Sequence, residues 1–329
     1  MEIISAKKYP DKEKLLSFYH EIFPGRANLP TEYWSWLYTG SDNSSAYPLL
    51  AVESGKIIGH AGGTPCTLNL NKKSYSSAWF NDFMMLEPYR GKGVGKKLTE
   101  AWMAQVSTGI TFCNDQSIEV FNKFGWEESF SIDFHTLFIR PFNHPKIAKK
   151  IPRSLSSISN RLYKYAYIKN AAPIETKPYT TNDKFSNLLD NCTDRTDDYW
   201  EWRVTTSPQL EKYSITGTTG SKVLFKLSKD SYGNYIDILY IENLADVNTV
   251  LESIQGIIQI GIEEGYDFIR LLAAQNHISK LIKQNFKSYV THPRFAFFAS
   301  NDNLRNEMRN AEWNWQLIDS DFEKFVNEK

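Results

Sequence analysis

The sequence predicts an α+β protein made of two similar halves, each with a mixed, largely antiparallel sheet flanked by helices. Two observations carry this prediction. Over residues 1–142, antiparallel strand signals are followed by a strand–helix–strand pattern, which is typical of an α+β domain. The tetrapeptide Tyr-Trp-x-Trp then occurs twice, at 33–36 and at 199–202, and tryptophan is too scarce for chance to be a good explanation. We therefore expect a tandem duplication.

The elements of the first half follow from its hydrophobic pattern. Residues 11–23 have the spacing of a short amphipathic helix. Residues 47–86 contain strand sequences separated by a turn signal at Ser54-Gly55 and a weaker one at Asn71-Lys72. The later elements are a helix over 94–106, a strand over 109–115, a helix over 117–126 and a strand over 130–140.

The predicted domain boundaries are 1–142 for the first domain, 143–173 for a linker and 174–329 for the second domain. The linker holds seven Lys or Arg residues and no acidic residue, and Pro145 and Pro173 stand near its ends. Its positive charge is compatible with weak contact to an anionic membrane surface or to a nucleotide. The interpretation that we favour at this point is a solvated connector with some helix.

Composition excludes several classes of protein. Lysine plus arginine equals aspartate plus glutamate, at 38 each, so no large nucleic-acid footprint is expected. Three widely spaced cysteines form neither a disulfide framework nor a zinc set, and we expect no metal. No segment approaches the roughly 18 apolar residues of a membrane span, and the N-terminus does not resemble a signal peptide. We expect a cytoplasmic protein without an integral membrane segment.

Residues 87–98, with the sequence EPYRGKGVGKKL, predict a phosphate-binding loop. They follow a predicted strand over 78–86 and open a helix, whose N-terminal N–H groups bind anions. Glycines let the backbone approach a phosphate closely. The spacing fits neither a Walker A loop nor a dinucleotide loop, which requires a third glycine where Lys96 stands. The pattern that does fit is Arg90-x-x-Gly93-x-Gly95.

This loop resembles that of the GNAT superfamily of acyl-coenzyme A dependent N-acyltransferases. The preceding strand, Pro88, and the segment FNKFGW at 121–126 strengthen the resemblance. It covers residues 1–140 through the motif and about 174–320 only through the repeat. It implies two GNAT-like domains, and only the first carries a cofactor loop, because ENLADVNTVLESIQGI at 242–257 replaces the loop in the second.

The resemblance also implies a mode of binding coenzyme A. The pyrophosphate would lie on the backbone amides of 91–96, and the pantetheine arm would pair with the strand end at 84–86. An N–H of Met85 or Leu86 would polarise the thioester carbonyl. Asn114 either contacts the pantetheine or caps the next helix. The predicted cofactor-binding residues are Met84, Met85, Leu86, Arg90, Gly91, Lys92, Gly93, Val94, Gly95, Lys96 and Asn114.

Direct acyl transfer requires a neutral amine and therefore a base. Asp82 is the first candidate, because an acid inside an otherwise apolar strand is costly unless it is used or paired. His60 and Glu87 are the other candidates, whereas His135 is better explained as a core histidine. In many members of the family a tyrosine protonates the departing thiolate. Phe121 stands at that position here, so no side-chain acid can be assigned.

The predicted function is transfer of an acyl group, with acetyl-coenzyme A as donor, to the primary amine of a small molecule. Similar two-part chains of the family favour a nucleotide-linked amino sugar of surface-polysaccharide synthesis. The aromatic segments around 31–38 and 197–204 could stack on sugars, although their repeated positions suit a core role better. Alternative acceptors are an amino acid, a polyamine or an antibiotic amine. Alternative functions are an inactive acyl-coenzyme A-binding module and aminoacyl-tRNA dependent peptide-bond formation, against which the intact loop and zero net charge argue.

Overall fold

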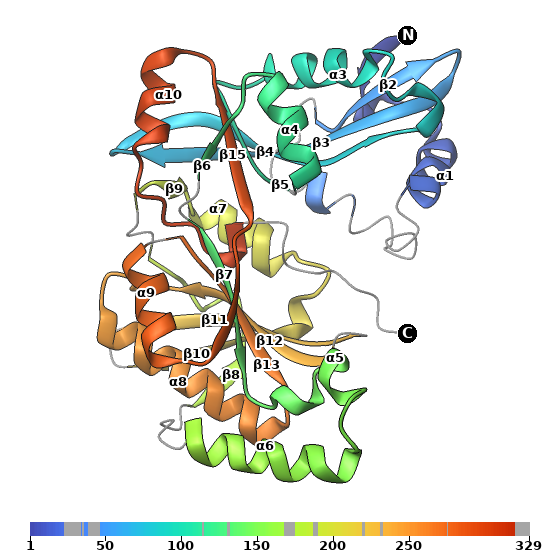
Figure 1. The fold of residues 1–329 in the computed structure, drawn as a ribbon. Helices are drawn as coiled ribbons and strands as arrows, with labels where there is room; N and C mark the ends of the chain where they lie inside the picture. Colours follow the sequence, from blue (N-terminus) through green and yellow to red (C-terminus); the bar gives the residue numbers. More distant parts are fainter. Residues whose placement is uncertain are drawn as a thin grey trace.

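The computed structural model describes residues 1–22, 34, 36–38, 47–113, 115–129, 132–167, 175–186, 190–218, 221–230, 233–274 and 276–319. Two mixed sheets with flanking helices make up this part of the chain, one in the upper and one in the lower part of Figure 1. The predicted fold class is confirmed.

The first sheet has the order β1-β2-β3-β4-β5-β15-β6, and β9 pairs with β3. Both predicted turns are present: Ser54 and Gly55 join β2 to β3, and Asn71 and Lys72 join β3 to β4, all with positive φ, which suits tight hairpins. The strands are β1 (Glu2–Ser5), β2 (Leu49–Glu53), β3 (Lys56–Leu70), β4 (Lys73–Met85), β5 (Thr108–Cys113), β6 (Glu127–Ser129), β9 (Cys192–Thr193) and β15 (Arg294–Ala299).

Helices cover this sheet as the periodicity predicts. In α3, Val94, Leu98 and Trp102 are buried, and Trp102 donates its indole N–H to the carbonyl of Gly62 at 2.8 Å. The short strand β6 was not predicted. The helical elements of this half are η1 (Ala6–Lys8), α1 (Lys12–Ile22), η2 (Glu87–Tyr89), α3 (Val94–Met103) and α4 (Asp115–Lys123).

The second sheet has the order β14-β7-β13-β12-β11-β10-β8. Its strands are β7 (Asp133–Phe138), β8 (Thr176–Pro178), β10 (Tyr213–Thr218), β11 (Ser221–Asp230), β12 (Gly233–Ile241), β13 (Phe268–Ala273) and β14 (Ser288–Thr291). The remaining helical elements are η3 (Pro141–Asn143), α5 (Pro145–Ala148), α6 (Arg153–Tyr167), α7 (Asp197–Trp200), η4 (Glu201–Thr205), η5 (Leu210–Lys212), α8 (Val247–Glu264), α9 (Asn276–Asn285), α10 (Asp302–Arg309) and η6 (Leu317–Asp319).

The two halves exchange strands, and the two-residue β9 of the second half also pairs with β3 of the first sheet. β7 of the first half lies between β13 and β14 of the second sheet, and β15 of the second half lies between β5 and β6 of the first (Figure 1). The boundaries predicted at 142 and 174 follow the order of the repeats along the chain, but each sheet contains strands from both sides of these boundaries. Each sheet is completed by a strand from the other half, because neighbours in a sheet need not be neighbours in sequence.

The repeated tryptophans join the two halves. Trp36 Nε1 donates to the carbonyl of Trp202 at 2.6 Å, and Trp202 Nε1 donates to the carbonyl of Trp36 at 2.8 Å. Their rings stack with centroids 5.7 Å apart. Reciprocal contacts between equivalent positions are those that a two-fold axis produces. These two rings therefore belong neither to separate domain cores nor to a sugar-stacking face, which corrects both interpretations of this pair.

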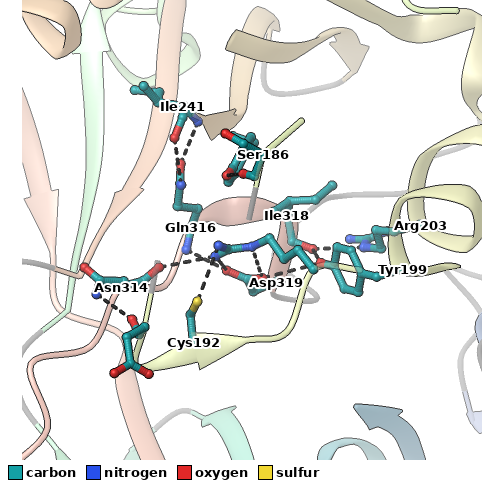
Figure 2. A network of polar contacts seen from close by, with 12 residues as sticks. Ser186, Cys192, Tyr199, Arg203, Ile241, Asn314, Gln316, Ile318 and Asp319 are labelled. Atoms are coloured by element: carbon teal, nitrogen blue, oxygen red, sulfur yellow. Dashed lines mark hydrogen bonds and ion pairs between the residues drawn. The ribbon is translucent and has the colours of Figure 1, made fainter. Parts of the chain in front are cut away.

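A buried polar network fixes the stretch 314–319 (Figure 2). Arg195 donates to both carboxylate oxygens of Asp319, at 3.0 and 2.5 Å, and both side chains are fully buried. Gln316 exchanges two hydrogen bonds with the backbone of Ile241, and Tyr199 donates to the carbonyl of Ile318. The bidentate pairing of Arg195 with Asp319 offsets part of the cost of desolvating the two charges. The network holds this stretch against α7 and β12.

Candidate active site

The strands β4 and β5 pair over a short stretch only, from Ser77 to Trp79 of β4 and from Thr108 to Ile110 of β5. Their parallel pairing ends at Trp79 and Ile110. Beyond that point β4 continues to Met85 and β5 to Cys113, and within the described residues no ladder pair joins them. Within the described residues the edge of β4 over 81–85 therefore has no ladder partner in β5, at the place where the family resemblance implies that the two strands splay.

A bulge at Asp82 accompanies this divergence. The register between β3 and β4 shifts between His60 and Gly62, and Asp82 has a φ of +47°. Positive φ is uncommon for residues other than glycine, although aspartate adopts it more often than most, and such residues cluster at functional sites. A bulge bends its strand and increases the local twist, which fits the departure of β4 from β5. Asp82 thus lies where the strand edge becomes free of β5.

Backbone direction distinguishes the two candidate N–H donors at the end of β4. The N–H of Leu86 donates to the carbonyl of Ile58 at 3.0 Å, so it points towards β3. Successive residues of a strand direct their N–H groups to opposite sides, and the N–H of Met85 therefore points away from β3, on the side where β5 pairs further back along β4. The carbonyl of Met85 also lies on that side, where it accepts from Arg90 Nε at 3.2 Å. Leu86 is excluded as the donor, and Met85 stays a candidate.

The glycine loop leads from this strand end into α3. Gly91 and Gly93 have φ values of +73° and +79°, which glycine adopts readily, and the space next to each is open. Gly93 is the N-cap of α3, and no side chain caps the helix. The N–H groups of the first helical turn are thus not satisfied by a side-chain cap. An exposed helix start of this kind fits an anionic group such as a pyrophosphate.

Three cations surround the loop. Arg90, Lys92 and Lys96 are exposed, and Lys96 lies 3.8 Å from Glu100, one turn further along α3. Such exposed ion pairs contribute little to stability, so these side chains can turn to a ligand at small cost. The loop therefore combines backbone donors and positive charge at one place.

The equivalent helix of the second half is closed by its own carboxylate. Asp246 caps α8, accepting from the backbone N–H groups of Asn248 and Thr249 at 3.0 and 3.5 Å, and from the Thr249 hydroxyl at 2.8 Å. The hydrogen bonds from Thr249 lower the pKa of Asp246. The Asp246 carboxylate therefore occupies the N-terminus of α8, whereas the N-terminus of α3 has no side-chain cap and can accept an anion.

His60 is the centre of a buried hydrogen-bond chain beside the bulge. Its Nδ1 lies 2.7 Å from the carbonyl of Asp82, which can only accept, so Nδ1 carries the proton. Its Nε2 then accepts from the Tyr19 hydroxyl at 2.5 Å, and that hydroxyl accepts from Trp34 Nε1 at 2.7 Å. Burial lowers the pKa of His60, which favours the neutral ring.

The carboxylate of Asp82 is half-buried and is held by a second tyrosine. Tyr38 donates its hydroxyl to Asp82 Oδ2 at 2.5 Å. The sequence analysis missed Tyr19 and Tyr38 as members of the site. Tyr38 ends the first aromatic repeat, which was interpreted only as core or sugar-stacking surface, and no pattern linked Tyr19 to β3.

The remaining predicted residues lie elsewhere or serve packing. Glu87 is exposed at the start of η2. His135 is fully buried in the second sheet, where Nε2 contacts Ser279 Oγ at 3.1 Å and burial lowers its pKa to about 4. It is a core histidine. Phe121 packs against Phe80 and Trp126, and Asn114 lies outside the described residues.

Comparison with known proteins agrees with this geometry. Residues 12–126 match the sequence model of the acetyltransferase (GNAT) family. No curated protein matches the chain. Solved structures resemble nearly all of it at low sequence identity, which shows the fold.

Three of these structures illustrate the likeness. A GCN5-related N-acetyltransferase from Anabaena variabilis has a TM-score of 0.59 at 12% identity, over 91% of this chain and 73% of that one. One from Kribbella flavida has a TM-score of 0.57 at 10% identity, over 91% and 71%. The Saccharomyces cerevisiae N-myristoyltransferase with bound myristoyl-CoA has a TM-score of 0.55 at 12% identity, over 92% and 87%. The region 12–126, which contains β4 and the glycine loop, therefore belongs to the GNAT acetyltransferase family, on a chain whose two sheets have a GNAT-like fold.

Proposed function

We propose that this protein is an acyl-coenzyme A dependent N-acyltransferase, with acetyl-coenzyme A as the expected donor. The observation that carries the proposal is the end of the β4–β5 ladder at Trp79 and Ile110, followed along the chain by the uncapped start of α3. A free strand edge next to an anion-binding helix N-terminus suits a ligand that has an extended, amide-containing arm and a pyrophosphate. One such site is expected per chain, since Asp246 occupies the equivalent helix start of the second half.

The chain's residues would bind the donor in two parts. Backbone N–H groups from Gly93 to Lys96 would hold the pyrophosphate, with Arg90 and Lys92 adding charge. The backbone of Met85 at the free edge of β4 would pair with a pantetheine amide as an additional strand would, whereas Met84, like Leu86, directs its N–H towards β3. The Met85 N–H would then donate to the thioester oxygen, where negative charge develops.

In the reaction, the amine nitrogen attacks the thioester carbonyl carbon and the carbon–sulfur bond breaks. One proton of the attacking ammonium must first reach a base, and the departing thiolate takes up another. We assign the base to Asp82, because it combines a half-buried carboxylate with a position at the bulge. Tyr38 would orient that carboxylate through its hydrogen bond.

His60 is better suited to positioning than to proton abstraction. Both ring nitrogens are engaged, one by the Asp82 carbonyl and one by Tyr19, and the ring is fully buried. Glu87 is exposed and is the remaining alternative. Phe121 supplies no hydroxyl for the thiolate, so Tyr89 or water is the source of that proton. A thiolate leaves readily enough for activity without a dedicated acid.

The acceptor that we propose is the primary amine of a small molecule, with a nucleotide-linked amino sugar as the leading class. Trp36 and Trp202 do not support this choice, because they stack on each other. The choice therefore depends on the family resemblance alone. An amino acid, a polyamine or an antibiotic amine is the alternative.

The test is release of free thiol from acetyl-coenzyme A with a panel of amines that includes nucleotide-linked amino sugars. We expect thiol release that depends on one class of amine, with the N-acylated product identified by mass spectrometry. Butyryl- and myristoyl-coenzyme A, assayed in parallel, would define the acyl chain length. Binding of acyl-coenzyme A without turnover for any amine would show an inactive binding module instead. Absence of binding would overturn the proposal.

A further inference from the structure

The helix α6 contacts the rest of the protein through a polar side. Asn160 is buried there, with 8% of its surface exposed. Its Oδ1 accepts from the backbone N–H of Phe142 at 3.1 Å, and its Nδ2 donates to Asn143 Oδ1 at 2.8 Å. Asn143 in turn donates to Asp267 Oδ1 at 2.8 Å. The helix is therefore anchored to the second half by hydrogen bonds from its inward side.

Apolar side chains cover the opposite side of α6. Leu155, Ile158, Leu162 and Tyr165 are exposed to 52%, 58%, 66% and 79%. At about 100° per residue, their spacing of three and four places them in one row, roughly opposite Asn160. Helices of globular proteins normally turn such a row inwards. Figure 1 shows α6 at the end of the molecule away from the first sheet, so the row faces outwards at an extremity.

Positive charge accompanies this row. Lys149 and Lys150 precede the helix, Arg161 and Lys164 lie on it, and all four are exposed. Residues 141–174 contain no aspartate or glutamate, although acids and bases balance over the whole chain. The charge of the segment is thus not neutralised by its own sequence. At about 100° per residue, Arg161 lies on the flank of the apolar row, whereas Lys164 lies on the same side of the helix as Asn160.

We propose that α6 docks the protein on a membrane surface that contains anionic lipids. The helix would lie in the plane of the interface, with Leu155, Ile158 and Leu162 among the upper acyl chains and the cations at the headgroups. Anionic headgroups complement this segment. A second copy of α6 would instead place Arg161 and Lys164 near cations of its partner, without an acid in the segment to pair with them.

The contact would be peripheral. Within the ranges that the structure describes, no helix is both long and apolar enough to cross a bilayer. The proposal rests on α6 alone and stands or falls separately from acyl transfer. It assigns to the exposed side of α6 the weak membrane contact that was expected of the basic linker.

The experiment is sedimentation of the full chain with vesicles of phosphatidylcholine, either alone or mixed equally with phosphatidylglycerol. We expect binding to the mixed vesicles and little to phosphatidylcholine alone. Leu155→Gln combined with Leu162→Gln keeps helix propensity and should lower the partition coefficient about tenfold or more. Arg161→Gln should lower it roughly fivefold on the anionic vesicles. High salt should act in the same direction as this second variant.

The matched control is Tyr289→Thr, which removes an apolar side chain that is 62% exposed in β14, outside the helix. It should bind vesicles like the parent protein. Circular dichroism and acetyl-coenzyme A affinity should be the same in all variants, which separates lost docking from lost folding. Equal binding to both kinds of vesicle, or full binding by the Leu155/Leu162 variant, would overturn the proposal. So would a lipid-free dimer that the same variant abolishes, because α6 would then be a self-association face.

Discussion

At the scale of single residues, Asp82 and His60 are the two candidates for the base, and they are hydrogen-bonded to each other at the bulge. Asp82→Asn keeps the volume of the side chain but removes the proton acceptor. If Asp82 is the base, kcat should fall by roughly 10². The affinity for acetyl-coenzyme A should hardly change, because the cradle at 90–96 is untouched. Steady-state thiol release and calorimetry measure the two quantities.

His60→Gln is the companion variant. It should also lower the rate, because His60 holds the Asp82 carbonyl and Tyr19. The parent pH profile should change with Asp82→Asn and keep its shape with His60→Gln. If Asp82→Asn retains the parent rate while His60→Gln is inactive, His60 is the base. If both variants stay active, water removes the proton.

His135 gives a pH dependence of stability. Burial lowers the pKa of its ring from 6.5 to about 4, so the folded protein favours the neutral form. This contribution is complete above pH 6.5, where the unfolded chain is also neutral. It is lost as the pH falls towards 4, because the unfolded chain then takes up the proton first, and the loss reaches about 3 kcal/mol.

The measurement is urea denaturation of the parent and of His135→Gln between pH 7.5 and 4, a window chosen to span both of these pKa values. The parent should lose more stability on acidification than the variant, so the gap between them should narrow. A gap that stays constant with pH would mean that His135 is not held neutral by burial.

At the scale of elements, the starts of α3 and α8 form a natural comparison. Gly93→Asp brings a carboxylate and an unfavourable positive φ into the cradle, and it should abolish acetyl-coenzyme A binding. Gly55→Asp is the matched control, since Gly55 has φ +76° and open space but lies in a hairpin away from the loop. Calorimetry should show loss of binding in the first variant only.

The same comparison predicts stoichiometry. Because Asp246 closes the start of α8, the parent should bind one acetyl-coenzyme A per chain. Asp246→Ala should lower stability through the lost cap and should leave this stoichiometry at one, since α8 lacks the cations of the first loop. Binding of two acetyl-coenzyme A molecules per parent chain would contradict the prediction that the second half has no cofactor site.

At the scale of the whole molecule, the exchange of β7 and β15 makes each sheet depend on both halves. A fragment of residues 1–142 lacks β15, whose Phe295, Ala296 and Phe297 are buried between the halves and in the first core. It should aggregate or stay unfolded, because β5 then has an unpaired edge. Co-expression with residues 143–329 should restore a soluble complex, and the intact chain should unfold in one transition. A soluble 1–142 fragment with parent affinity for acetyl-coenzyme A would show that the exchange is dispensable.

The sequence by itself determined the features that depend on short stretches of chain. The glycine loop, the turns at 54–55 and 71–72, the helix predicted over 94–106, which ends at Met103, and the family assignment all follow from residues within one or two elements of each other. Positive φ values at glycine and an apolar face at helical spacing are local properties, and local sequence encodes them.

Only the tertiary structure decided which distant residues meet. Tyr19 of α1 meets His60 of β3, and Tyr38 meets Asp82 of β4, and no local pattern records these contacts. No local pattern records the exchange of β7 and β15 or the exposure of the apolar row on α6 either. Strand order and helix orientation depend on how the whole chain buries its apolar surface, which is a property of the assembled molecule and not of any one segment.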